Sequence, residues 1–264
     1  MSVEKRKIKN NMHYFIVNPN ARSHQGIVLW KDIKKVLDEK EIDYREILTN
    51  RPGDATKASS KLTKNPDRKV NIVVLGGDGT LNETINGIEH ISNVTLGYIP
   101  IGSSNDFARA MNISGTPLEI LEEILNPKAY MNLDYGIVSA GEYSRKYVVS
   151  AGIGYDAGVC YETNYSSIKK VLNKLHLGKA TYIVIAVKQL LTQKFVDGSI
   201  CIDDERDIKL HGLILAATHI QKYEGGGLMF CPKADPTDGI LDICIAMNIP
   251  RLGVIGIIPK AYKG

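Results

Sequence analysis

A glycine loop, Gly76-Gly77-Asp78-Gly79, constrains the fold of this chain more than any other feature of its sequence. It separates an apolar run at residues 70–75 from a helical pattern that begins at Thr80. Such a run is typical of a strand that is buried on both faces of a parallel sheet. Glycines between a strand and a helix let a ligand approach the backbone amides closely. The loop therefore predicts an α/β fold with an anion-binding turn at the end of a central strand.

Short apolar runs alternate with helical patterns over the first half of the chain, which is typical of a parallel α/β sheet. In the first helical pattern Trp30, Ile33 and Leu37 fall on one face, because they stand at i, i+3 and i+7. The expected strands are 14–17, 44–49, 70–75 and 96–101, and the expected helices are 27–37, 55–62, 80–89 and 107–111.

Strand-like segments dominate the second half of the chain. We place a domain boundary between Asn126 and Asp134, because Asn126-Pro127 is a helix-ending pair. Residues 1–130 are then an α/β domain and residues 131–264 a β-rich domain. The expected strands of the second domain are 146–150, 199–202, 208–218 and 240–247, with a helix at 179–191 and a helical turn near 166–175.

The composition narrows the class of protein. A chain of 264 residues that is 44% hydrophobic and 23% charged is long enough for one or two globular domains. The net charge is only +4, from 33 basic and 29 acidic residues, which argues against nucleic-acid binding. No run reaches the roughly 20 apolar residues that span a bilayer. Any contact with a membrane is therefore expected to be peripheral. The four cysteines are widely separated and form no CxxC pair, so we expect reduced thiols in a cytoplasmic protein.

Three further loops follow the carboxyl ends of predicted strands, which is the edge where open α/β sheets bind ligands. They lie at residues 18–21, 49–55 and 102–106. Gly102 permits close backbone approach, and the Ser103 hydroxyl can bond a phosphate or a ribose. Asp78 would repel phosphate, but it is suited to hold Mg²⁺ or to accept the proton of an attacking hydroxyl. The four loops together predict a crevice for a polyphosphate.

Purely structural interpretations of the same residues stay open at this point. Thr80 and Glu83 fit the S/T-x-x-E pattern of a capping box. Ser104 or Asn105 is suited to cap the helix at residues 107–111. Capping and ligand binding are compatible at one position.

The motifs resemble those of the diacylglycerol kinase family, which also includes sphingosine and ceramide kinases and bacterial YegS-like or BmrU-like lipid kinases. The resemblance implies a Rossmann-like α/β domain of the NAD kinase and diacylglycerol kinase type, followed by a β-sandwich-like domain. It also implies transfer of the γ-phosphate of ATP to a lipid hydroxyl, with diacylglycerol as the first candidate. The matching segments run in family order over almost the whole chain and are Asn18-Pro19, residues 76–83, residues 100–108, Gly225-Gly226-Gly227 and residues 238–242.

The resemblance also assigns site residues, among them Asp78 as a catalytic residue. Mg²⁺ would be held by the main-chain oxygens of Asp235 and Ile240 with the Asp238 carboxylate, an oxygen set that suits this ion. A surface turn is the alternative for that segment, because Pro-Thr-Asp-Gly is turn chemistry by itself. The residues expected to bind ATP are Asn18, Thr49, Gly76, Gly77, Asp78, Gly79, Thr80, Leu81, Asn82, Gly102 and Ser103.

The resemblance has departures and leaves alternatives. The family has an Asn shortly before its triple glycine, where this chain has Thr218 and His219. Family members continue beyond the level of Gly264 with an Asp-Gly-Glu segment that supplies a base, so we expect the second domain to be incomplete here. The expected partner is a lipid at a membrane surface. The resemblance is also compatible with a homodimer, in which the partner is a second copy of the chain. NAD kinase activity and a non-catalytic nucleotide-binding role are the alternatives.

Overall fold

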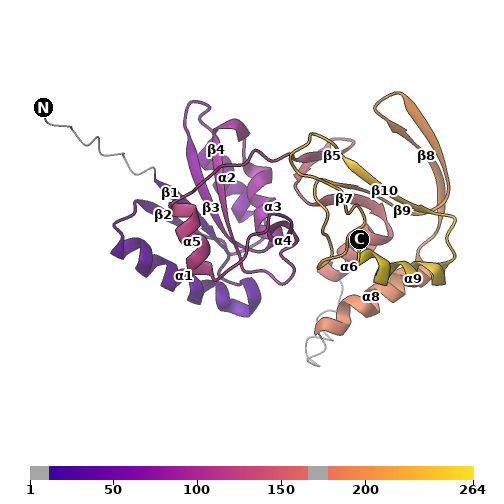
Figure 1. Ribbon diagram of the computed structural model, residues 1–264, viewed down its shortest axis with the longest axis horizontal. Helices are drawn as coiled ribbons and strands as arrows, with labels where there is room; N and C mark the ends of the chain where they lie inside the picture. The colour runs from indigo at the N-terminus through magenta and orange to yellow at the C-terminus, as the bar shows by residue number, and fades with distance from the viewer. Residues whose placement is uncertain (1–11, 166–177) are drawn as a thin grey trace, which may run out of the picture. The chain divides into compact units, whose positions relative to one another are not determined.

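The computed structural model describes residues 12–165 and 178–264 of the chain (Figure 1). They form two compact units. The first unit comprises the described residues of Met1–Asn132 together with Ser139–Tyr147, and the second comprises those of Leu133–Val138 and Val148–Gly264. The boundary between residues 130 and 131 remains a proposal.

The first unit contains a parallel sheet of four strands in the order β2-β1-β3-β4. The strands are β1 (His13–Val17), β2 (Tyr44–Leu48), β3 (Val70–Gly76) and β4 (Val94–Pro100). The helices are α1 (Ala21–Glu39), α2 (Asp54–Thr63), α3 (Asp78–Gly87), α4 (Asp106–Ala110) and α5 (Pro117–Leu125), with a 3₁₀ turn η1 (Ile91–Asn93).

The register of the sheet brings the carboxyl ends of its strands to one edge. Val17 of β1 pairs with Leu48 of β2 and with Leu75 of β3. Gly76 at the end of β3 pairs with Pro100 at the end of β4. The four loops that follow these strands therefore start side by side.

One face of this sheet carries the core predicted from the first helical pattern. Trp30, Ile33 and Leu37 are all buried, which confirms the face predicted for that helix. They pack with side chains of β1 and β3 and with Ile120 and Leu121 of α5. The helices α1 and α5 thus cover the same face of the sheet.

The second unit is built on an antiparallel sheet in the order β10-β9-β7, with β8 also paired to β9. Its helix α8 packs on the sheet through a small core of Leu190, Ile214 and Val254. The strands are β7 (Ser150–Gly154), β8 (Val196–Ile202), β9 (Arg206–His219) and β10 (Asp242–Met247), and the helices are α6 (Tyr155–Tyr165), α8 (Gly178–Thr192) and α9 (Arg251–Ala261). A hairpin of β5 (Gly136–Ala140) and β6 (Tyr143–Tyr147) forms a separate two-stranded sheet, of which β6 belongs to the first unit.

The predicted fold class, a parallel α/β domain followed by an antiparallel β-rich domain, is confirmed. Several boundaries were wrong: α1 begins at Ala21, and the strand expected at residues 146–150 is divided between β6 and β7. The helices α6 and α9 were missed, and the turn expected near 166–175 lies outside the described residues. Throughout the described ranges, each helix is too short or too polar to cross a lipid bilayer.

Candidate active site

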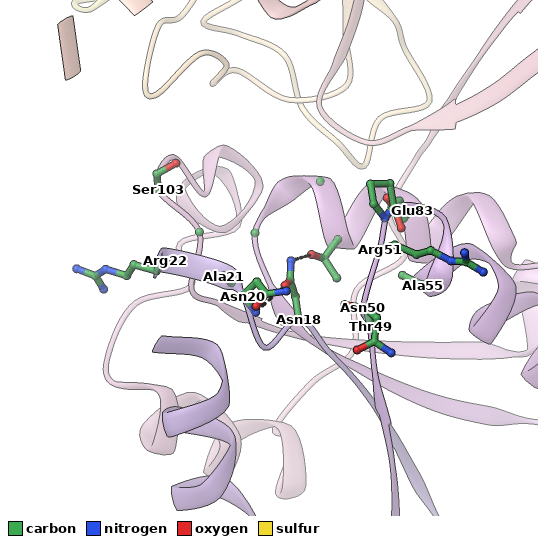
Figure 2. A pocket seen from close by; sticks show the side chains of 15 residues that line it. Asn18, Asn20, Ala21, Arg22, Thr49, Asn50, Arg51, Ala55, Glu83 and Ser103 are labelled. Atoms are coloured by element: carbon green, nitrogen blue, oxygen red, sulfur yellow. Dashed lines mark hydrogen bonds between the residues drawn. The ribbon is translucent and has the colours of Figure 1, made fainter. Parts of the chain in front are cut away.

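A pocket of about 470 Å³ opens at the carboxyl edge of the parallel sheet (Figure 2). Its lining comes from the loops that follow β1, β2, β3 and β4, as the strand register requires. The lining residues are Asn18, Asn20, Ala21, Arg22, Thr49, Asn50, Arg51, Pro52, Ala55, Gly77, Gly79, Thr80, Glu83, Gly102 and Ser103. The crevice predicted from the four loops is therefore present as a cavity.

The glycine loop brings backbone to the pocket with little side chain in the way. The helix α3 begins at Asp78, so the amides of its first turn have no partner within the helix. A Cβ atom on Gly79 would meet nothing within 4 Å, because this residue faces open space. Unpaired amides at a helix start attract anions. This part of the pocket can therefore bind a phosphate group through the main chain.

Gly77 and Gly102 bring two of the loops into direct backbone contact. A Cβ atom on Gly102 would lie 2.7 Å from the Cα atom of Gly77, and one on Gly77 would lie 3.1 Å from the Cα atom of Gly102. Asn105 fixes the Gly102 loop, because its side chain accepts from the Gly102 nitrogen at 2.9 Å and donates to the Gly102 oxygen at 3.0 Å. Both glycines are needed for this close approach.

Asp78 joins the same two loops through its carboxylate. Its Oδ2 atom accepts from the backbone nitrogen of Asp106 at 3.0 Å, and its Oδ1 atom accepts from that of Phe107 at 3.3 Å. These nitrogens belong to the first turn of α4, where an acceptor from outside the helix is needed. Asp78 thus caps α4 in place of Ser104 or Asn105, since the Asn105 side chain makes no capping hydrogen bond.

Two polar side chains tie the β1 and β2 loops to the rest of the site. Asn18 donates from Nδ2 to the Thr80 hydroxyl at 3.1 Å and accepts from the Asn20 nitrogen through Oδ1 at 3.1 Å. The Thr49 hydroxyl donates to the Val17 carbonyl at 3.3 Å. These bonds hold the wall of the pocket in one arrangement.

The capping box considered for Thr80 and Glu83 does not form. The N-cap of α3 is Gly77, and the Glu83 carboxylate instead accepts from the Gly53 nitrogen at 2.9 Å. A capping box is present at α5, where Thr116 and Glu119 bond reciprocally. The capping pattern at Thr80 is not realised because Glu83, in the middle of α3, bonds to the start of α2.

Most of the predicted nucleotide-binding residues gather at this pocket. Asn18, Thr49, Gly77, Gly79, Thr80, Gly102 and Ser103 line it. The other four lie beside the lining: Gly76 and Leu81 are buried, Asp78 caps α4, and Asn82 donates to the Lys146 carbonyl at 3.2 Å. Most of the remaining lining residues belong to segments that the sequence had singled out: Asn20, Ala21, Asn50, Arg51, Pro52 and Ala55 to the loops at 18–21 and 49–55, and Glu83 to the motif at 76–83. Arg22 was missed, and its place directly after the loop at 18–21 was the available signal.

The proposed metal segment of the second unit is a turn whose carboxylates bond to nearby main chain. Asp235 accepts from the Thr237 nitrogen at 3.0 Å, and Asp238 accepts from the Ile240 nitrogen at 2.9 Å. Asp134 accepts from the Gly239 nitrogen at 2.7 Å. In the described part of the chain no three His, Cys, Asp or Glu side chains are grouped to hold a metal. An ion here would need main-chain oxygens as well.

A second polar cluster lies inside the second unit around His219. The imidazole is fully buried, and its Nδ1 atom lies 3.9 Å from the Glu224 carboxylate. Burial lowers the pKa of His219 and raises the pKa of Asp156 to about 6. Sequence reasoning did not single out Asp156. Its carboxylate takes the space above Gly152, where a Cβ atom would lie 2.3 Å from Asp156 Oδ2.

Both units match known domains and proteins. A diacylglycerol kinase catalytic domain matches residues 12–136, and a YegS C-terminal NAD kinase beta sandwich-like domain matches residues 148–264. A diacylglycerol kinase from Staphylococcus saprophyticus is 31% identical over 244 residues, which are 91% of this chain and 75% of that protein. A diacylglycerol kinase from Staphylococcus carnosus is 28% identical over 243 residues, with 91% of this chain and 74% of that protein covered. The solved structure of a diacylglycerol kinase from Bacillus anthracis shares the fold, with a TM-score of 0.67, 23% identity, and 95% of this chain and 80% of that chain covered.

Proposed function

Because this chain belongs to the diacylglycerol kinase family and is an ATP-dependent lipid kinase, we propose that its glycine-lined pocket binds the triphosphate of ATP. We propose diacylglycerol as the acceptor. The observation that carries the proposal is the pocket at the carboxyl edge of the parallel sheet, with the α3 helix start on its wall. Two independent features, strand polarity and bare glycine backbone, favour a phosphate ligand at this place.

The main chain at the α3 start performs the central task in this account. Phosphoryl transfer needs positioning and stabilisation of negative charge more than covalent chemistry by the protein. Amides of Gly79 and Thr80 would donate to phosphate oxygens, and the Ser103 hydroxyl would donate from the opposite loop. Because Gly77 and Gly102 hold the two loops in contact, these donors keep a fixed spacing.

Asp78 has two proposed roles that its hydrogen bonds constrain. Each oxygen already accepts one main-chain N–H of α4, and a carboxylate oxygen has further acceptor capacity. The catalytic role proposed for Asp78, holding Mg²⁺ or accepting the hydroxyl proton, would use that remaining capacity. Its positioning role, which fixes α4 beside the glycine loop, operates in either case.

We propose Mg²⁺ as the metal, because the site offers carboxylate and main-chain oxygens, which are the ligands that Mg²⁺ prefers. Held beside the phosphates by the Asp78 carboxylate, it would neutralise charge that develops during transfer. For the second unit we propose Asp235, Asp238 and Ile240 as a structural site, because carboxylate and main-chain oxygens are the ligands that Mg²⁺ prefers. The turn is held by Asp134, so these oxygens keep a defined arrangement.

We assign acceptor binding and contact with a membrane surface to the second unit. Large apolar side chains remain exposed on it, and such side chains mark an interaction site where they form one contiguous patch. They include Ile153, Tyr161, Leu191, Ile240 and Ile255. We also propose a homodimer, which the family resemblance favours and which sedimentation at several protein concentrations would test.

The assay for this function measures transfer of labelled γ-phosphate from ATP to diacylglycerol, ceramide, a sphingoid base and NAD in parallel. We expect label in diacylglycerol in mixed micelles with Mg²⁺, and none in NAD. The matched control is Asp32→Asn, at an exposed position of α1 outside the pocket lining, which should leave the rate unchanged. Label in ceramide or a sphingoid base alone would reject diacylglycerol as the acceptor. Label in NAD alone would reject the lipid assignment.

A further inference from the structure

The charged side chains that line the nucleotide pocket differ in the ion pairs and hydrogen bonds that they make with the rest of the protein. The lining contains three of them, Arg22, Arg51 and Glu83. Arg51 has its Nε atom 3.6 Å from an oxygen of Asp54, and Glu83 accepts from the Gly53 nitrogen at 2.9 Å. For Arg22, by contrast, the described residues provide no ion pair and no side-chain hydrogen bond. The part of the chain that the structure describes therefore leaves the side-chain donors of Arg22 unused.

The backbone of Arg22 adopts a conformation that arginine rarely takes. Its φ angle is +49°, in the left-handed region, which is uncommon for residues other than glycine. Strained residues of this kind persist when their surroundings fix them, and they gather at functional sites. His24, two residues later, also has a positive φ angle, of +69°, so this feature belongs to the start of α1 and by itself shows no function.

The surroundings that fix Arg22 are the tight contacts between the β1 loop and α1. A Cβ atom on Gly26 would lie 2.2 Å from the Asn18 carbonyl oxygen, so the helix packs directly on the loop. Ile27 donates from its backbone nitrogen to the Pro19 carbonyl at 3.2 Å. Asn18 is in turn bonded to Thr80 of α3. The residue is thus anchored at the pocket rim through main chain on both sides.

The two arginines stand on different sides of the pocket. Figure 2 shows Arg22 on the side of Ser103, and Arg51 on the side of Glu83. Arg22 is exposed, and its long side chain can turn about several bonds to reach a ligand at the rim. A guanidinium forms two parallel hydrogen bonds with a phosphate, which gives charge and geometry together.

We infer that Arg22 binds the phosphate chain of the nucleotide and makes the pocket select triphosphates over monophosphates. The inference rests on the proposed function, because it takes the pocket as the ATP site. The ligand class is a nucleoside triphosphate, whose charge the pocket's glycine amides neutralise only in part. Arg22 supplies a side-chain cation that, unlike Arg51, has no ion pair with the described residues.

The test measures dissociation constants of ATP, ADP and AMP by calorimetry for the wild type, Arg22→Ala and Arg22→Lys. We expect Arg22→Ala to weaken ATP binding about tenfold and AMP binding by less than about twofold, since the lost contact is to the outer phosphates. Arg22→Lys should recover part of the loss, because it keeps the charge without the planar fork. Added salt should weaken ATP binding more steeply in the wild type than in Arg22→Ala.

Two further variants separate charge, strain and folding. Arg22→Gly removes the side chain at a position whose φ angle suits glycine, so it should lose ATP affinity as Arg22→Ala does while its thermal midpoint does not fall. Arg45→Ala removes an exposed arginine of β2 that lies outside the pocket lining, and it should bind ATP as the wild type does.

The outcomes distinguish the inference from the function on which it rests. Wild-type ATP affinity in both Arg22→Ala and Arg22→Gly would overturn the role of Arg22 and leave the ATP site intact. Equal losses for ATP and AMP would also overturn it, because the contact would then not be to the outer phosphates. Failure of the wild type itself to bind ATP would reject the proposed function.

Discussion

The carboxylate of Asp78 accepts a hydrogen bond of 3.0 Å from the backbone nitrogen of Asp106, so the first residue of α3 caps the first turn of α4. A second bond of 3.3 Å, from the Phe107 nitrogen, completes the cap. Since α3 follows β3 and α4 follows β4, this cap joins two walls of the pocket. The residue proposed for catalysis is therefore also part of the framework that holds the phosphate donors.

Asp78→Asn tests both roles of this residue. An amide keeps one acceptor oxygen but turns an N–H group toward a helix N–H, so we expect a loss of about 1–2 kcal/mol in the free energy of unfolding. Turnover should fall by about 10²-fold or more if the carboxylate also acts in proton transfer. Denaturant unfolding and the lipid phosphorylation assay measure the two effects separately.

Asp32→Asn on the exposed face of α1 is the control for the loss of one negative charge. Wild-type turnover in Asp78→Asn would contradict a catalytic role for Asp78. Unchanged unfolding would contradict the contribution of the cap to stability.

Gly79→Ala is expected to raise the stability of the protein and to weaken its binding of ATP. A Cβ atom here meets nothing within 4 Å, and the position is helical, so the free energy of unfolding should rise by up to about 1 kcal/mol. The same methyl group enters the pocket where phosphate approaches the backbone, so ATP affinity should fall about tenfold. A more stable protein with unchanged ATP affinity would show that the phosphates lie elsewhere.

Gly77→Val tests the contact between the two loops. Its Cβ atom would lie 3.1 Å from the Gly102 Cα atom, and the branched side chain adds bulk at the same point. We expect ATP binding to be lost in calorimetry and the thermal midpoint to fall, because Gly102 has no room to move away from Asn105. Retained affinity in a folded Gly77→Val protein would argue against the backbone cradle.

Asp156 predicts a dependence of stability on pH. Its pKa of about 6 in the folded protein exceeds its ordinary value of 3.8, chiefly because of burial, so the folded state binds the proton more tightly than the unfolded state. Its contribution to stability is therefore complete below pH 3.8 and is lost as the pH rises through about 6. Asp156→Asn, which stays neutral, should gain stability relative to the wild type as the pH rises from 4 to 7.

Neighbouring titratable groups also affect the stability of the wild type and of Asp156→Asn. His219 and Glu224 face Asp156, and the lowered pKa of His219 acts in the opposite direction, by reducing stability as the pH falls below 6.5. Both proteins contain these groups, so the difference between their unfolding curves reports mainly Asp156. A difference that does not change with pH would contradict the buried, proton-binding state of this carboxyl.

The turn at Asp238 predicts a response to Mg²⁺. If the ion binds there, millimolar Mg²⁺ should raise the thermal midpoint of the second unit's transition, and a chelator should reverse the rise. Asp238→Asn should lose the response, whereas Asp204→Asn, in the exposed turn before β9, should keep it. The same rise in both variants would show that Mg²⁺ acts at another place.

The sequence was informative where one local rule decided the structure. The spacing of Trp30, Ile33 and Leu37 predicted a buried helical face, and all three are buried because the sheet behind them is apolar. The glycine loop predicted a turn at a strand end, because glycine adopts the backbone conformations that a tight turn between a strand and a helix requires. Parallel strands then brought the four loops together, as their common direction requires.

The sequence was uninformative where contacts between distant residues decided the structure. Glu83 bonds to Gly53 rather than to its own helix start, and Asp78 caps a helix that begins 28 residues later. The helix α6 begins in a glycine-containing segment with weak helix propensity, so no periodic pattern predicted it. Arg22 lines the pocket only because α1 begins six residues earlier than its apolar pattern.

The most direct test of the account is a crystal structure of the protein with Mg²⁺ and a non-hydrolysable ATP analogue. We predict phosphate oxygens within hydrogen-bonding distance of the backbone nitrogens of Gly79 and Thr80, with the Ser103 hydroxyl on the other side of the phosphate chain. A nucleotide bound elsewhere, with these amides facing only water, would contradict the assignment of this pocket as the ATP site.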